Sequence, residues 1–142
     1  MNFTRIALAA IGAFVAYFVL GGLSFAALPW LKNEFLKYPA VYRSQEGIKS
    51  VMPAGMAAMF LAMLVLAVIY AMLYQGGSDF AQCPLRYAIG VFAVCVFVVH
   101  NYVNLNIGLK LTLEQAAAYF VEWTVVGIVI GLIYKPALPG AH

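Results

Sequence analysis

Residues 116–134 read AAAYFVEWTVVGIVIGLIY, an apolar stretch of helical length that carries one charged residue, Glu122. A helix needs about 20 apolar residues to cross the roughly 30 Å hydrocarbon layer of a membrane. A carboxylate within such a helix costs about 2.5–3.5 kcal/mol on insertion scales, so it usually faces a partner rather than lipid. The stretch therefore predicts a membrane-spanning helix, and it makes Glu122 the first candidate for a functional residue.

Three further stretches have the same character. Only helices and closed barrels satisfy their backbone hydrogen bonds in lipid, and these stretches lack the two-residue alternation of barrel strands. We therefore expect an all-α membrane protein, a four-helix transmembrane bundle in which residues 1–142 form a single integral-membrane domain. The four predicted spans cover residues 6–28, 51–73, 87–107 and 116–134, and none of them contains Asp, Lys or Arg.

The composition excludes a soluble class of protein. The chain is 65% hydrophobic and 9% charged, and its eight Lys/Arg and five Asp/Glu residues are too few to cover a soluble core. The charges gather in the first connection, residues 29–50, where they alternate with aromatic residues. This mixture is typical of a short helix lying among the lipid headgroups. The bilayer is thus the expected partner, and no nucleic acid is expected.

The distribution of basic residues gives only a weak prediction of orientation. A simple count favours the side that holds the first and third connections as the cytoplasmic one. The basic residues of the first connection are mixed with acids, however, whereas Arg5 and Arg86 lie directly at the ends of spans. We therefore expect both termini in the cytoplasm, and we expect the membrane to be a bacterial inner membrane.

Polar residues gather in the third and fourth spans. Residues spaced three or four apart share a helical face, which places His100, Asn101 and Asn104 together on one span. If residues 108–115 form a short connection, the two spans are antiparallel, and facing residues have numbers that sum to about 222. This register predicts a hydrogen bond or ion pair between His100 and Glu122. The corresponding face of the fourth span carries Gln115, Tyr119 and Glu122.

Two interpretations of these polar residues remain open. They can simply hold two helices together, as interhelical hydrogen bonds often do. They can instead line a polar pocket inside the membrane that binds or transports a small ligand or a proton, with Arg43 of the first connection meeting an anionic ligand or Glu122. A third possibility is an accessory subunit of a larger membrane complex. The sequence holds no pattern that identifies a cofactor, and an enzyme is not expected.

Methionines recur along one face of the second predicted span. Met52, Met56, Met59 and Met63 follow at intervals of four, three and four. Thioethers suit Cu(I), so these residues, together with His100, are candidate metal ligands. The Met-x-x-x-Met spacing and a Gly-x-x-x-Gly in another span are similar to the eukaryotic high-affinity copper transporters, which implies copper handling. Those proteins carry the two motifs on successive helices of three, whereas here they fall in the second and fourth spans.

The Gly-x-x-x-Gly motif consists of Gly127 and Gly131. Small residues at this spacing let two helices approach closely in a membrane. The motif predicts packing within the bundle. The alternative is that it supports a homo-oligomer or docking to a larger membrane complex.

Overall fold

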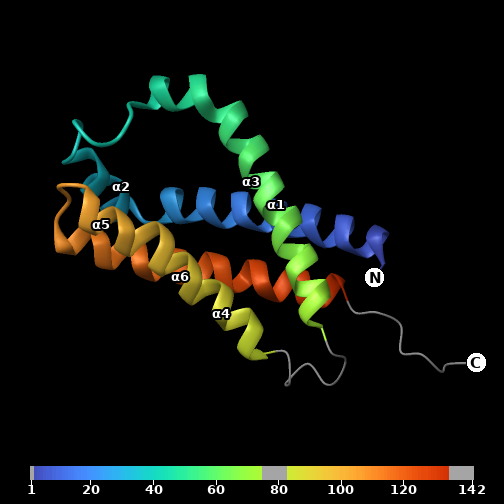
Figure 1. Cartoon of the computed structure of the whole chain (residues 1–142). Helices are drawn as coiled ribbons and strands as arrows, with labels where there is room; N and C mark the ends of the chain where they lie inside the picture. Colours follow the sequence, from blue (N-terminus) through green and yellow to red (C-terminus); the bar gives the residue numbers. More distant parts are fainter. Residues whose placement is uncertain (1, 75–82, 135–142) are drawn as a thin grey trace, which may run out of the picture.

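The computed structural model describes residues 2–74 and 83–134, and the regular structure in these ranges is entirely helical. Four helical units are long and apolar enough to cross a membrane. They confirm the predicted four-helix transmembrane bundle, and the chain is an integral membrane protein (Figure 1). In chain order the elements are α1 (Phe3–Ala27), α2 (Pro29–Leu36), α3 (Gln45–Leu73), α4 (Cys83–Ala93), the π-helical segment η1 (Val94–Val99), α5 (His100–Asn104) and α6 (Leu109–Ile133).

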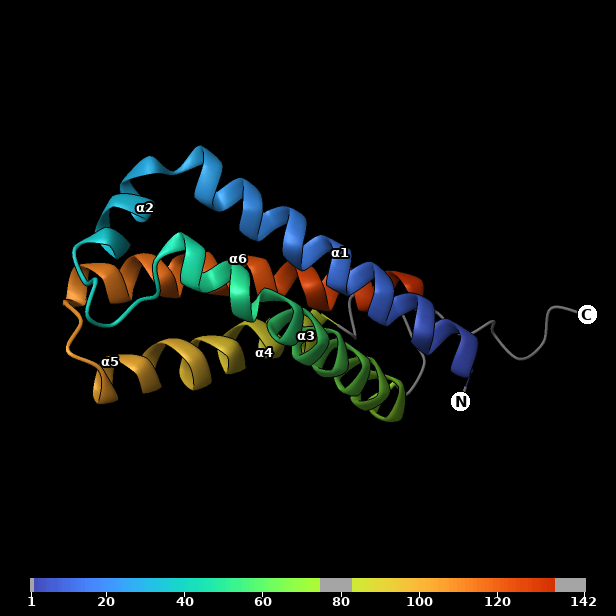
Figure 2. The ribbon, with the colours of Figure 1, turned by 90° about the horizontal axis from the view of Figure 1, so that it is seen from above.

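Helix α6 is the centre of the bundle. It lies between α1 on one side and the continuous rod α4–η1–α5 on the other (Figure 2). Glycines on α6 allow its neighbours to approach closely. A Cβ added at Gly127 would lie 3.0 Å from the carbonyl oxygen of Arg86 on α4. One added at Gly131 would lie 2.7 Å from the Tyr70 hydroxyl on α3. The Gly-x-x-x-Gly motif is therefore buried inside this chain.

The main apolar core occupies the end of the bundle where α1 begins and α6 ends. Small residues of α1 pack against α3 and α6 there, and α4 packs against α6. Ala9, Ala10 and Ala13 are fully enclosed, as is Met63 of α3. The other enclosed members are Ile6, Ala67, Tyr70, Ala71, Ile89, Ala93, Trp123, Val126, Ile130 and Tyr134.

Helix α3 leaves the bundle at the opposite end. Its C-terminal half crosses α1 obliquely, whereas its N-terminal half diverges from the other helices (Figure 1). Residues 48–58 are all exposed. Pro53 lies within this half, and a proline inside a helix removes one backbone hydrogen bond and favours a bend. An open space therefore separates the first half of α3 from α1 and α6.

The first connection contains the predicted interfacial helix, α2, which is held against the start of α6. Lys110 Nζ donates a hydrogen bond of 2.7 Å to Glu34 Oε1, and Lys37 also binds this oxygen. The backbone N–H of Gly108 donates to the Tyr38 hydroxyl at 2.9 Å. A small apolar cluster of Leu31, Ile107 and Leu111 lies beneath these contacts.

The boundary of the fourth span differs from the prediction. Helix α6 begins at Leu109, so the turn after α5 comprises residues 105–108 rather than 108–115. Charged and polar residues at 110, 112, 114 and 115 lower the hydropathy of this segment, but they do not prevent it from being helical. The helix simply extends beyond its most apolar part.

Candidate functional site

A cleft of about 590 Å³ lies between α1, α6 and the diverging half of α3, with α2 at one end. Its walls are mostly apolar and aromatic, and its polar groups come from α1 and α6. This combination is typical of ligand sites in proteins, where a few polar groups orient a mainly apolar ligand. The lining residues are Tyr17, Phe18, Gly21, Gly22, Ser24, Phe25, Leu31, Phe35, Ile48, Met52, Gln115, Ala118, Tyr119 and Glu122.

Glu122 is the acidic residue of this cleft, and it is 7% exposed. It lies 13 residues from the start of α6 and 11 from its end, which places it near mid-helix, roughly 20 Å and 16 Å from the two ends. Ser24 on α1 is its hydrogen-bonding neighbour. No Lys, Arg or His is among the residues that line the cleft. The carboxyl group therefore lacks a basic partner within the part of the chain that the structure describes.

Gln115 is the second polar residue on the same wall. Its Nε2 donates a 3.2 Å hydrogen bond to the hydroxyl of Tyr42, which joins the first connection to α6. Its Oε1 is buried and has no hydrogen-bonding partner. Buried acceptors are usually paired, so this oxygen is an exception among the described residues.

Aromatic rings surround the inner part of the cleft. The Tyr17 ring of α1 lies 5.5 Å from the Trp123 ring, centroid to centroid, and Trp123 in turn stacks on Phe97. The hydroxyl groups of Tyr17 and Tyr119 are neighbours across the α1–α6 interface. Tyr17 and Tyr119 line the cleft together with Glu122, and Glu122 is buried.

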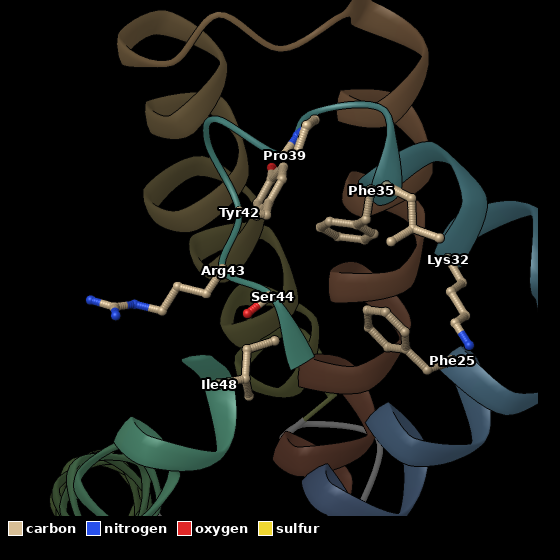
Figure 3. Close-up of a pocket in the computed structure, with 9 residues that line it drawn as sticks. Phe25, Lys32, Phe35, Pro39, Tyr42, Arg43, Ser44 and Ile48 are labelled. Atoms are coloured by element: carbon tan, nitrogen blue, oxygen red, sulfur yellow. The ribbon is translucent and has the colours of Figure 1, made fainter. Parts of the chain in front are cut away.

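A second cavity of about 640 Å³ adjoins the cleft where the first connection meets the start of α3. The two share Phe25, Phe35 and Ile48 in their walls. Phe25, Phe35 and Ile48 point into this cavity, whereas the Arg43 side chain extends away from it (Figure 3). The cleft that contains Glu122 therefore adjoins a cavity at the headgroup end of the bundle, and the shared wall is apolar.

The structure does not bring His100 to Glu122, so the predicted pair is wrong. His100 is exposed on α5, where Asn104 Nδ2 lies 3.3 Å from its Nδ1 and donates to its carbonyl oxygen at 2.8 Å. Asn101 is on the same short helix and is half-buried. This polar group lies on the outside of the bundle, next to the turn at residues 105–108.

The error comes from the register of the two helices. A Cβ added at Gly127 would contact Arg86 and Ile89, and one at Gly90 would contact Phe120 and Thr124. Facing residues thus have numbers that sum to about 210–216, because the turn is centred between Asn104 and Leu109. His100 therefore lies about nine residues, or roughly 14 Å, beyond the level of Glu122. The π-helical segment η1 also changes which face α5 presents, since a wider turn shifts every residue after it.

The other predicted site residues do not gather at one place in the structure. Gln115, Tyr119 and Glu122 share one wall of the cleft, whereas Arg43 lines only the adjoining cavity. Among the methionines, Met52 and Met56 are exposed, Met59 is half-buried and Met63 is enclosed by the core. The stripe therefore crosses three environments. No cluster of three or more His, Cys, Asp or Glu side chains suited to a metal is found in residues 2–74 and 83–134.

The sequence interpretation did not include the α1 side of the cleft. Tyr17, Gly21 and Ser24 follow at intervals of four and three, and all three line the cleft opposite Tyr119 and Glu122. The same spacing on the fourth span was recognised as a polar face. A search for a second polar face of this kind would have identified α1 as its partner.

We compared the chain with protein families, curated proteins and solved structures. No family model, curated protein or solved structure matches it.

Proposed function

We propose that this chain is a small membrane protein that binds an amphiphilic small molecule in the cleft around Glu122. The observation that carries the proposal is a carboxyl group, buried near the middle of a membrane-spanning helix, that lines an apolar cleft and has no basic partner there. Ionisable groups in such positions are costly and usually mark a ligand or ion pathway. The membrane is proposed to be a bacterial inner membrane with both termini in the cytoplasm.

The cleft also has a route by which a ligand can enter. It adjoins the cavity at the headgroup end, and the diverging half of α3 leaves it open beside α1. An amphiphile that partitions into the bilayer is therefore already at the depth of the site. The same hypothesis includes transport of the ligand, or of a proton on Glu122. Transport requires that the ligand binds, so binding is the part to test first.

Filling the cleft tests this proposal. A Cβ added at Gly21 has a single neighbour within 4 Å, the Glu122 carboxyl oxygen at 4.0 Å, so Gly21→Phe places a ring in the cleft without displacing backbone. Gly55→Phe is the matched control, because nothing lies within 4 Å of a Cβ at that position. Native mass spectrometry of the detergent-extracted chain should show a bound small molecule that Gly21→Phe loses and Gly55→Phe retains. Equal occupancy in the two variants, or none in the native chain, contradicts the proposal.

A second candidate function is that of an accessory subunit, and the first half of α3 favours it. Residues 48–58 are exposed, and they include Ala54, Gly55 and Ala58, which allow another helix to approach closely. The partner is then a larger membrane complex or a second copy of this chain. In the same mass spectra, this function predicts an additional chain, and Gly55→Phe rather than Gly21→Phe should remove it.

A further inference from the structure

We infer that the ligand of the cleft is a lipophilic cation, specifically a protonated amine carried on an apolar body, and that Glu122 binds its ammonium group. This inference rests on the proposed function and assigns the ligand's chemical class. The first reason is charge complementarity. Glu122 lines the cleft, the other lining residues contribute no positive charge, and a negative charge on a buried carboxylate is costly unless a cation pairs with it.

The second reason is the nature of the other polar groups. The other polar residues that line the cleft near Glu122 are Tyr17, Ser24 and Tyr119, and each carries a hydroxyl group. A hydroxyl oxygen can accept a hydrogen bond, and an ammonium group has three donors and no acceptor. These hydroxyls are therefore suited to the hydrogen bonds that an ammonium group makes beside a carboxylate.

The third reason is the aromatic lining. Cations are attracted to the faces of Tyr, Phe and Trp rings, and the attraction strengthens when water is excluded. Tyr17, Phe18 and Tyr119 surround the level of Glu122, and Phe25 and Phe35 continue towards the entrance. The apolar body of the ligand is thus accommodated between Glu122 and the headgroup end.

Cation binding also competes with protonation of Glu122, because a protonated carboxyl group is neutral and no longer attracts a cation. The other titratable groups that face Glu122 are Tyr17 of α1 and Tyr119 of α6, and phenols are neutral near pH 7. The residues contributed by α2 and α3, namely Leu31, Phe35, Ile48 and Met52, are apolar. Affinity should therefore fall on acidification, and the fall should depend on Glu122.

The test compares two probes that differ only in charge. Isothermal titration calorimetry in a neutral maltoside detergent would measure 4-phenylbutylamine and 4-phenylbutanol binding to the native chain, to Glu122→Gln and to Glu46→Gln. Glu46 is an exposed carboxylate outside the cleft, so it is the matched control. We expect at least a tenfold preference for the amine in the native chain and in Glu46→Gln, lost in Glu122→Gln and reduced at low pH.

The possible outcomes separate the two claims. If the alcohol binds as tightly as the amine and both are displaced by Gly21→Phe, the cleft is a ligand site but the inference about charge is wrong. If the preference for the amine persists in Glu122→Gln, the anchor is another group and the inference fails. If neither probe binds the native chain, the inference fails, and the proposed function is then judged by the mass spectra alone. The preference of the native chain for the amine over the alcohol can be measured without any variant. The inference about charge is therefore still tested if Glu122→Gln does not fold.

Discussion

Lys110 Nζ lies 2.7 Å from Glu34 Oε1, and this ion pair joins the first turn of α6 to the interfacial helix α2. Lys37 binds the same carboxyl oxygen, and Lys110 also lies 3.8 Å from Glu114. The two lysine side chains cover Glu34, although it lies at the periphery of the bundle. Together with the Tyr38–Gly108 bond, the pair fixes the position of the first connection over the headgroup end.

The Glu34 ion pair predicts a pH dependence of stability. Hydrogen bonds from Lys110, and then from Lys37, hold the pKa of the Glu34 carboxyl below its usual value. A lowered pKa in the folded state stabilises the fold above the unfolded pKa of about 4.3, and this contribution disappears as the pH falls through the folded value. Glu34→Gln should lower the melting temperature at pH 7 and flatten its decrease below pH 4. Thermal unfolding followed by circular dichroism measures both, and an unchanged acid profile would contradict the assignment.

The control for this experiment is Glu46→Gln. Glu46 is exposed in the first turn of α3 and has no ion pair within residues 2–74 and 83–134. Its replacement should leave the acid profile nearly as it is in the native chain.

Close packing of α4 against α6 predicts that Gly127 tolerates no side chain. A Cβ there would lie 3.0 Å from the Arg86 carbonyl oxygen and 3.2 Å from its Cα, so the backbones would have to separate. Overpacking of this kind costs about 1–3 kcal/mol. We expect Gly127→Ala to lower the free energy of unfolding in detergent by that amount. Gly55→Ala, where the added Cβ meets nothing within 4 Å, should change it little; equal effects would rule out this packing.

The hydrogen bond between Gly108 and Tyr38 predicts a specific effect at the start of α6. Gly108 is the N-cap of this helix, and its N–H donates to the Tyr38 hydroxyl. Tyr38→Phe removes the acceptor and should destabilise the chain by about 1 kcal/mol. It should also speed hydrogen exchange at the Gly108 amide. Tyr102→Phe removes an exposed hydroxyl on α5 and should do neither.

The register of α4 and α6 can be tested by cross-linking. In a background with Cys83 and Cys95 replaced by serine, the pair Gly90→Cys and Thr124→Cys should form a disulfide on mild oxidation, because these positions are in contact. The pair His100→Cys and Glu122→Cys should not. Mass spectrometry of peptides after oxidation gives the readout, and the reverse result would restore the register expected from the sequence.

The sequence was sufficient to predict the four membrane-spanning helices and the interfacial helix, because hydropathy determines both in a lipid environment. It also placed Gln115, Tyr119 and Glu122 on one face, since helical spacing alone decides that. The partner of this face was not predictable in the same way. It depends on where the turn before α6 is centred, and hydropathy cannot locate a helix that continues past its apolar part.

The divergence of α3 was also beyond the reach of sequence periodicity. Its first half carries Glu46, Lys49 and Pro53, which indicate where the apolar span begins and where a bend is favoured, but they do not indicate whether residues 51–58 touch α1 or face lipid. That divergence leaves the cleft open beside α1 and α6, with Ile48 and Met52 of α3 in its wall.

The enclosed alanines of α1 bear on whether a ligand could cross the membrane through this bundle. Ala9, Ala10 and Ala13 are fully enclosed between the start of α1 and the level of the cleft, whereas the cleft adjoins a second cavity at the opposite end. Delivery across the bilayer requires access to alternate between the two faces. Helix α3 is in contact with α1 mainly through its second half, around Met63 and Ala67. For the proposed ligand, passage towards the face where α1 begins would therefore require this contact between α1 and α3 to open.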